Sequence, residues 1–185
     1  MKTHPFTLQW QVTPAIHVRE ASPADAPALY HLINRDRAYL REWLPFVDMS
    51  QSAADTEAYL RYVSADGNTS DLVFVILYKE ELAGLIGYKG IDRLNKKLEI
   101  GYWLAEPQQG KGIMRRSCQT LLRHAFDTLN MNRIELRVGV GNTRSSNIPQ
   151  KLGFTLEGIQ RQGEFLNGSF HDLEVYSLLK IEFKS

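Results

Sequence analysis

The sequence has little cysteine, no long hydrophobic run and almost no excess charge. Its 185 residues include one cysteine, Cys118, which excludes a disulfide within the chain. The longest apolar stretches, such as LVFVILY at residues 72–78, are far shorter than the roughly 20 residues that a transmembrane helix needs. With 22 basic and 21 acidic residues, no overall field favours nucleic acid or an anionic membrane. We therefore expect neither as a direct partner.

Targeting and metal-binding signals are also missing. The opening MKTHPFTLQWQV lacks the apolar core of a signal peptide, so we expect a cytoplasmic protein. Cys118 falls on the apolar stripe of a predicted helix, which favours a buried, inert thiol over a nucleophile. The histidines show no metal-ligand spacing, so we expect no metal; they are His4, His17, His31, His124 and His171.

The composition and the hydrophobic periodicity predict one mixed domain over residues 1–185. Hydrophobic residues make up 43% and charged residues 23%, as in ordinary globular proteins. Helical spacing predicts helices over residues 22–44 and 52–68, from Ile113 to Leu129, and over 146–152. Alternating or apolar runs predict strands at 15–21, 72–78, 82–91, 97–105, 134–140, 154–166 and 170–179, the last two joined by an Asn-Gly turn. The fold class is therefore α/β of the α+β type, a mixed, largely antiparallel sheet of about seven strands flanked by helices.

The segment EPQQGKGI places Gly110, Lys111 and Gly112 where the helix at Ile113 begins. The first amides of a helix have no partners inside it, so they can bind an anion, phosphate above all. Glycines let the backbone approach the phosphate oxygens, and Lys111 adds positive charge. The alternative is a tight strand-to-helix turn without a ligand. The spacing matches neither the P-loop nor the three-glycine dinucleotide fingerprint.

Three motifs together give a family resemblance. The runs LREWLPFVD, GYWLAEPQQGKGI and NTRSSNIPQKLGF occur in this order over nearly the whole chain. They resemble the GCN5-related N-acetyltransferase (GNAT) superfamily, within its subgroup of ribosomal-protein N-terminal acetyltransferases of the RimJ/RimL type. The resemblance implies the GNAT fold, with acetyl-CoA as cosubstrate. Pro107 departs from the family pattern, which usually has Gln or Arg at the start of this loop.

The resemblance also implies where acetyl-CoA binds. Backbone amides from Gln109 to Met114 would hold the pyrophosphate, and the pantetheine arm would lie between a strand splayed near Trp103 and the strand ending near Val140. A backbone N–H near Leu104, freed by a β-bulge, would support the oxyanion. Asn142 would contact the pantetheine, with stabilisation of a turn as its alternative. The implied cofactor-binding residues are Trp103, Leu104, Gln109, Gly110, Lys111, Gly112, Ile113, Met114 and Asn142.

Acetyl transfer to an amine needs a base for the amine and a proton for the departing thiolate. An α-amine, with a pKa of about 8, loses its proton more easily at neutral pH than a lysine, at about 10.4. The resemblance places the base at Glu164 in RQGEFLNG, and the proton donor at Ser145. The alternatives are a solvated strand carboxylate for Glu164 and a helix N-cap for Ser145.

The segment REWLPFVD gathers large apolar side chains where a predicted helix ends at a proline. In similar proteins this connection walls the acceptor site, so Trp43, Leu44 and Phe46 are the predicted substrate-binding residues. The alternative is a plug of apolar residues that only packs between two helices.

Together these observations predict an acetyl-CoA-dependent N-acetyltransferase that acts on the α-amine of a protein N-terminus, with a ribosomal protein beginning with Ser as the expected acceptor. Acetylation of a small amine, such as a polyamine, amino acid or antibiotic, is the second enzymatic hypothesis. A binding module that senses acyl-CoA without turning it over is the non-enzymatic one. We also expect a homodimer, because edge strands near the end of the chain could pair with another copy.

Overall fold

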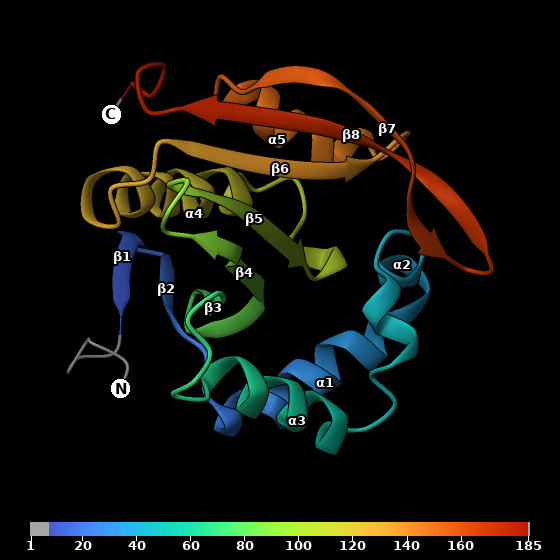
Figure 1. Ribbon diagram of the computed structural model, residues 1–185. Coiled ribbons are helices and arrows are strands. Elements are labelled where there is room, and N and C mark those ends of the chain that lie inside the picture. The colour runs from blue at the N-terminus through green and yellow to red at the C-terminus, as the bar shows by residue number, and fades with distance from the viewer. Residues whose placement is uncertain (1–7, 185) are drawn as a thin grey trace.

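The computed structural model describes residues 8–184 and contains one eight-stranded sheet with helices on both faces (Figure 1). The strands are β1 (Gln9–Thr13), β2 (Ile16–Glu20), β3 (Leu72–Tyr78), β4 (Glu81–Asp92), β5 (Lys97–Leu104), β6 (Arg133–Gly139), β7 (Thr155–Leu166) and β8 (Ser169–Leu179). Their spatial order is β1-β2-β3-β4-β5-β6-β8-β7. His4 lies outside the described residues, and the single domain over 1–185 stays a prediction.

The helices fall between these strands. They are α1 (Ala26–Arg35), α2 (Arg37–Arg41), α3 (Ala53–Ser64), α4 (Ile113–Arg123) and α5 (Thr143–Lys151). Short 3-10 turns occur at η1 (Pro23–Asp25), η2 (Pro45–Asp48) and η3 (Glu106–Gln108), and a π-helical turn, η4 (His124–Thr128), follows α4. None of the helices within residues 8–184 is long and apolar enough to cross a membrane.

The predicted mixed, largely antiparallel sheet is confirmed, with one strand more than expected. The seven predicted strands all form, and β1 adds an eighth at the edge, where Trp10 lies opposite Val18 of β2. The pattern of polar and apolar residues in this five-residue strand is too short to distinguish it from a loop. Every neighbouring pair is antiparallel except β5 and β6, which are parallel.

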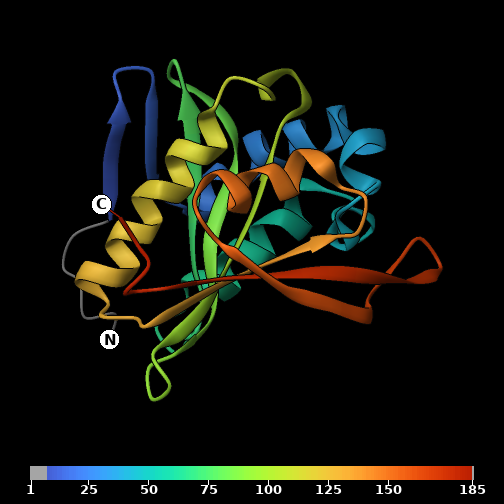
Figure 2. The same cartoon turned by 90° about the horizontal axis from the view of Figure 1, so that it is seen from above.

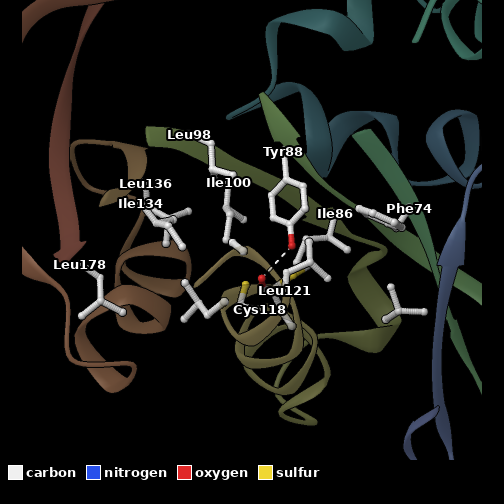
Figure 3. Close-up of a cluster of buried hydrophobic side chains, with 14 of the residues drawn as sticks. Phe74, Ile86, Tyr88, Leu98, Ile100, Cys118, Leu121, Ile134, Leu136 and Leu178 are labelled. Carbon is white, nitrogen blue, oxygen red and sulfur yellow. Dashed lines mark hydrogen bonds between the residues drawn. The ribbon is translucent and has the colours of Figure 1, made fainter. Parts of the chain in front are cut away.

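Two apolar clusters fill the two faces of the sheet. Helix α4 packs its buried stripe on one face, where Leu121, Ile100 and Ile134 are fully buried (Figure 3). Helices α1 and α3 cover the other face. Cys118 lies inside the first cluster, and burial raises the pKa of its thiol, which keeps it protonated. The prediction of a buried thiol is confirmed.

The first long helix is broken where one helix was predicted over residues 22–44. Helix α1 ends at Arg35, and α2 begins at Arg37. Between them the buried carboxylate of Asp36 accepts hydrogen bonds from the Arg35 guanidinium and from the backbone N–H of Glu106, at 2.9 Å. This contact over 70 residues of sequence fixes the break against the loop that precedes α4. Periodicity alone does not show such a break.

Strands β5 and β6 pair only at their first residues. Lys97, Leu98 and Glu99 lie opposite Arg133, Ile134 and Glu135, and neither strand continues the ladder beyond them. The rest of β5 stays paired with β4, while the rest of β6 stays paired with β8. The two strands therefore separate toward the start of α4 (Figure 1), and a cavity opens between them.

Strands β7 and β8 form a long hairpin that extends beyond the body of the sheet (Figure 2). Its turn is the predicted Asn-Gly pair, with φ of +52° at Asn167 and +83° at Gly168. The Asn167 side chain donates a hydrogen bond to the backbone oxygen of Arg41, at 3.0 Å. The tip of the hairpin is thereby fixed to the end of α2.

Candidate active site

A cavity of about 320 Å³ opens where β5 and β6 separate. Its walls come from β5, β6, the start of α5, the end of α2 and the tip region of β7. Nine of the residues predicted from the sequence line it: Trp43, Leu44, Trp103, Leu104, Gln109, Met114, Asn142, Ser145 and Glu164. Segments that are far apart in the chain thus meet at one place.

The glycine-containing loop lies at one end of this cavity and presents its backbone. Gly110 and Gly112 have φ values of +76° and +71°, which non-glycine residues rarely adopt. The first hydrogen bond at the start of α4 runs from the Arg116 N–H to the Gly112 oxygen, at 3.2 Å, so the amides of residues 113–115 precede it. Ile113 and Met114 bury their side chains in the core. The loop can therefore bind an anion only through its main chain and nearby cations.

Lys111 and Arg116 supply positive charge to this loop. Lys111 Nζ lies 2.8 Å from Gln108 Oε1 and 5.4 Å from the ring centre of Tyr78. Arg116 Nη1 donates to the backbone oxygen of Lys111, at 3.3 Å. Both side chains are exposed, so they remain able to contact a ligand. Gly110, Lys111, Gly112 and Ile113 lie in the loop and do not line the cavity itself.

The backbone of Leu104 faces the cleft, for a reason other than the predicted one. The β4–β5 ladder is regular from Gly84 opposite Leu104 to Lys89 opposite Glu99, so the expected bulge is absent there. The Ala105 N–H donates to the backbone oxygen of Ala83 on β4. Because successive N–H groups along a strand point to opposite sides, the N–H of Leu104 points away from β4, to the side where β6 no longer pairs with β5. Gln109 Nε2 donates to the Leu104 oxygen, at 3.1 Å. Strand separation, rather than a bulge, exposes this amide.

Helix α5 begins with Asn142 as its cap, and this corrects the alternative considered for Ser145. The Asn142 side chain accepts from the Ser145 N–H, at 3.1 Å, so the predicted capping role belongs to Asn142. Ser145 lies in the first turn, and its hydroxyl donates to the phenolic oxygen of Tyr102, at 3.3 Å. The Ser145 side chain therefore lines the cavity instead of capping the helix.

Glu164 is directed to the cavity by an irregularity in β7. The pairing of β7 with β8 shifts register between Leu156 and Gly158, and it shifts again between Gln160 and Glu164, which lies opposite His171. Between them Gln162 has φ of +52°, and its N–H donates to Asp172 Oδ1, at 2.7 Å. Such a bulge bends the strand and redirects the next side chain. The residues of β7 before Glu164 are exposed, whereas Glu164 itself is half-buried.

Burial raises the pKa of Glu164 above its ordinary value, and nearby charges adjust it. Lys89 and His171 lower this pKa, while Glu99 raises it. The Glu99 carboxylate itself lies 4.0 Å from Lys89 Nζ and 3.5 Å from Arg137 Nε. A carboxylate with a raised pKa is a better proton acceptor, which suits a general base.

Two of the three residues predicted to wall the acceptor site lie at the cavity. Trp43 and Leu44 line the cavity, and the Trp43 ring packs so closely that a Cβ on Gly139 would be 3.2 Å from its Cε3. Phe46 does not line the cavity; its ring lies 6.2 Å from that of Trp103 and packs with the α1–α3 cluster. The turn η2 thus places Phe46 beside Trp103 and outside the cavity wall, and its role as a substrate contact stays a prediction.

Several cavity residues were not predicted from the sequence, among them Lys89, Glu99, Tyr102 and Arg137. One signal was available: a glycine inside a strand often marks a close approach of another group. A Cβ on Gly101 would come within 2.7 Å of Lys89 Cε, so Gly101 lets the Lys89 side chain lie across β5.

Among residues 8–184, no group of three His, Cys, Asp or Glu side chains is arranged to hold a metal ion.

The sequence is similar to a family model and to known proteins. A family model described as an acetyltransferase (GNAT) domain matches residues 16–155. The Bacillus subtilis (strain 168) protein YdaF is 37% identical over 179 residues, covering 94% of this chain and 96% of its own. The ribosomal-protein-serine acetyltransferase of Escherichia coli (strain K12) is 31% identical over 168 residues, covering 90% and 94%.

A solved structure gives the same result for the fold. The ribosomal L7/L12 alpha-N-protein acetyltransferase RimL, solved in complex with coenzyme A, superposes with a TM-score of 0.88 at 29% identity, covering 93% of this chain and 98% of its own. The family match, the fold and the cleft between β5 and β6 lead to one conclusion: this chain belongs to the GNAT family of acetyltransferases.

Proposed function

We propose that the protein transfers the acetyl group of acetyl-CoA to the α-amine of a protein N-terminus, and that the acceptor is a ribosomal protein beginning with Ser. The observation that carries the proposal is the placement of Glu164 and Ser145 on walls of one cavity, next to the glycine loop. The similar E. coli and RimL enzymes, named for serine and for L7/L12, support the choice of acceptor. Ribosomal proteins are made in the cytoplasm, so we place the reaction there.

The residues present fit acetyl-CoA, whose thioester supplies the acetyl group. Backbone amides of residues 109–114 would hold the pyrophosphate, because the left-handed glycines leave the main chain open to oxygens. Trp103, Leu104 and Asn142 would contact the pantetheine arm in the cleft between β5 and β6. The N–H of Leu104, which faces this cleft, would donate to the oxyanion.

Two side chains would move the protons. Glu164 would take a proton from the acceptor amine, directly or through a water, so that the neutral nitrogen can attack the thioester carbonyl. Ser145 Oγ would give a proton to the sulfur, which keeps the electron pair of the broken C–S bond, and would recover a proton from solvent. Trp43 and Leu44 would wall the acceptor side of the cavity. An acceptor with a pKa of about 8 suits a carboxylate base better than a lysine at about 10.4.

Mass spectrometry of ribosomal proteins incubated with the protein and acetyl-CoA tests the proposal. One acetyl group on the N-terminus of a protein beginning with Ser is the expected product. The matched control is a peptide of that sequence with a blocked α-amine and a free lysine, which should gain nothing. Acetylation of spermidine with no acetylation of any N-terminus would instead favour the small-amine hypothesis.

The Glu164→Gln variant separates catalysis from binding. We expect kcat to fall by roughly 10²- to 10⁴-fold, because a general base is lost. The affinity for acetyl-CoA should be unchanged, since Glu164 is not among the residues proposed to hold the cofactor. The exposed Glu81 provides the matched control, Glu81→Gln, which should keep full turnover. Undiminished turnover in Glu164→Gln would remove Glu164 from the mechanism.

We further propose that two copies of the chain associate through β7. This strand is the last in the sheet order, so one edge of its backbone has no neighbouring strand among residues 8–184. It also exposes large apolar side chains, with exposed fractions of 50% at Leu156 and 49% at Ile159. Exposed edge strands with apolar side chains favour pairing with another chain. Light scattering should give the mass of a dimer, and Ile159→Lys should shift it to a monomer; a monomeric native protein would refute the pairing.

A further inference from the structure

The Ser145 hydroxyl is held by a residue from a different element. Tyr102 lies on β5, and its phenolic oxygen is 3.3 Å from Ser145 Oγ and 3.1 Å from the backbone oxygen of Ser145. A phenol has one proton, and Tyr102 donates it to the Ser145 carbonyl. Its oxygen is therefore left to accept from the Ser145 hydroxyl. One side chain thus contacts both the backbone and the side chain of Ser145.

Pro149 explains why the carbonyl of Ser145 can bind Tyr102. In an α-helix the carbonyl of residue 145 accepts from the N–H of residue 149, and proline has no N–H. Pro149 lies inside α5 and is buried. The carbonyl therefore lacks its helical donor, and the Tyr102 phenol takes that place. Because the Tyr102 phenol binds this carbonyl, it also lies beside the Ser145 hydroxyl.

The Tyr102 phenol stays a neutral donor. Burial raises the pKa of Tyr102 above its ordinary value, so the ring keeps its proton at neutral pH. A serine hydroxyl rotates freely unless a partner holds it. A hydrogen bond to a thiolate is stronger than one to a neutral phenol. The Ser145 proton should therefore leave Tyr102 for the sulfur only when negative charge develops there.

We propose that Tyr102 is a positioning residue that holds the Ser145 hydroxyl ready to donate to the sulfur of the acyl donor, and that Pro149 makes Tyr102 available for this. The inference rests on the proposed role of Ser145 as proton donor. A purely structural role is the alternative: Tyr102 would only satisfy a carbonyl that Pro149 leaves open. The two roles predict different results when a backbone N–H is restored at position 149. A structural role predicts that this N–H offsets the loss of Tyr102 in both stability and catalysis, whereas a positioning role predicts that it offsets only the loss of stability.

A double-mutant cycle of Tyr102→Phe and Pro149→Ala distinguishes them. Alanine at position 149 provides the missing N–H, so Tyr102→Phe should lower the melting temperature less in the Pro149→Ala background than in the native one. Nothing in that background replaces the contact with the hydroxyl. We therefore expect Tyr102→Phe to lower kcat roughly threefold to tenfold in both backgrounds, with KM for acetyl-CoA unchanged.

A second readout needs no acceptor. The pKa of the thiol of bound coenzyme A is measured from the ultraviolet absorbance of its thiolate, in the native protein and in the variants. Ser145→Ala should raise this thiol pKa, because a hydrogen bond to the thiolate is lost. Tyr102→Phe should raise it in the same direction and by less, again in both backgrounds.

The outcomes separate the two levels of the proposal. In the Pro149→Ala background, Tyr102→Phe could leave kcat and the thiol pKa as unaffected as it leaves stability. That result would overturn the positioning role and leave a structural one. A thiol pKa that Ser145→Ala does not move would refute the role of Ser145 itself, and the role of Tyr102 with it. If Tyr102→Phe alone does not fold, the comparison between Pro149→Ala and the double variant decides, because the carbonyl then has its own donor.

Discussion

Glu164 illustrates how single residues acquire their chemistry from their neighbours. The side chain is an ordinary glutamate in sequence, and burial raises its pKa while Lys89 and His171 lower it. Lys89 reaches this site only because Gly101 lets it lie across β5. The proton affinity of the proposed base is therefore set by groups on β4 and β8 as well as by its own burial.

Lys89→Met should shift the pH dependence of turnover. Removing the cation takes away an influence that lowers the pKa of Glu164, so this pKa should rise further. The carboxylate is the active form, and it is lost as the pH falls through the pKa. The acidic limb of the kcat profile should thus move to higher pH. Lys89→Arg, which keeps the charge, should leave the limb in place, and an unmoved limb in Lys89→Met would contradict the assignment of the limb to Glu164.

At the scale of elements, the loop between β5 and α4 depends on two glycine conformations. Gly112 caps α4 with φ of +71°, and a Cβ there would lie 3.2 Å from Arg116 Nη1. A residue with a Cβ costs about 1 kcal/mol or more in this conformation. The loop should therefore shift when Gly112 is replaced.

Gly112→Ala should weaken coenzyme A binding by roughly fivefold or more, since about 1 kcal/mol corresponds to that factor. Isothermal titration calorimetry with coenzyme A measures the change. Gly67→Ala is the matched control, because a Cβ at Gly67 meets nothing within 4 Å. Equal affinities for the Gly112 variant and the native protein would show that the pyrophosphate does not bind at this loop.

Three strands at the end of the sheet are connected by one charged pair. Arg133 of β6 donates to both carboxylate oxygens of Glu157 on β7, at 2.7 and 2.6 Å, across the intervening β8. Ser177 of β8 donates to the same carboxylate, at 2.7 Å. The Arg133 hydrogen bonds, followed by that from Ser177, lower the pKa of Glu157 to about 2.

Glu157→Gln should destabilise the protein at neutral pH but not in strong acid. A carboxylate whose pKa is lowered by folding stabilises the native state above its unfolded pKa, about 4.3, and this contribution is lost as the pH falls toward about 2. Since Glu157 is 41% exposed, we expect at most about 1 kcal/mol at pH 7. Urea unfolding at several pH values measures the difference in the free energy of unfolding between the native protein and the variant, with Glu42→Gln as control. A difference that does not change with pH would contradict the assignment of this contribution to the Glu157 carboxylate.

At the scale of the whole molecule, one sheet carries an apolar cluster on each face, and the cavity opens where β5 and β6 separate. Leu121 of α4 is fully buried, and its backbone oxygen accepts from the Tyr88 phenol, at 2.7 Å (Figure 3). This contact joins the helix that follows the glycine loop to the middle of the sheet. The position of the loop therefore depends on the packing of α4.

Leu121→Ala should lower the free energy of unfolding by about 2–5 kcal/mol, because it removes buried methyl groups and leaves a cavity. Leu94→Ala, at a side chain that is 91% exposed, should change it by less than about 0.5 kcal/mol. Denaturant unfolding of both variants measures these changes in the free energy of unfolding. A small effect at Leu121 would mean that the core around α4 closes the cavity by moving.

The sequence by itself determined every strand from β2 to β8, the start of α4 at Ile113 and the family to which the chain belongs. These follow from local rules: alternation of apolar residues, the backbone freedom of glycine, and motifs that keep their order. The missed strand β1 and the break at Asp36 show the limit of such rules, because a short edge strand has little pattern and the break depends on a contact with Glu106.

Only the tertiary structure decided how the candidate site is assembled. The bulge in β7 directs Glu164 into the cavity, η2 places Phe46 beside Trp103, and the Tyr102 phenol of β5 contacts Ser145 of α5. Each of these depends on the distance between elements that lie far apart in the chain. Local residue preferences do not encode such distances; strand order and packing across the sheet set them.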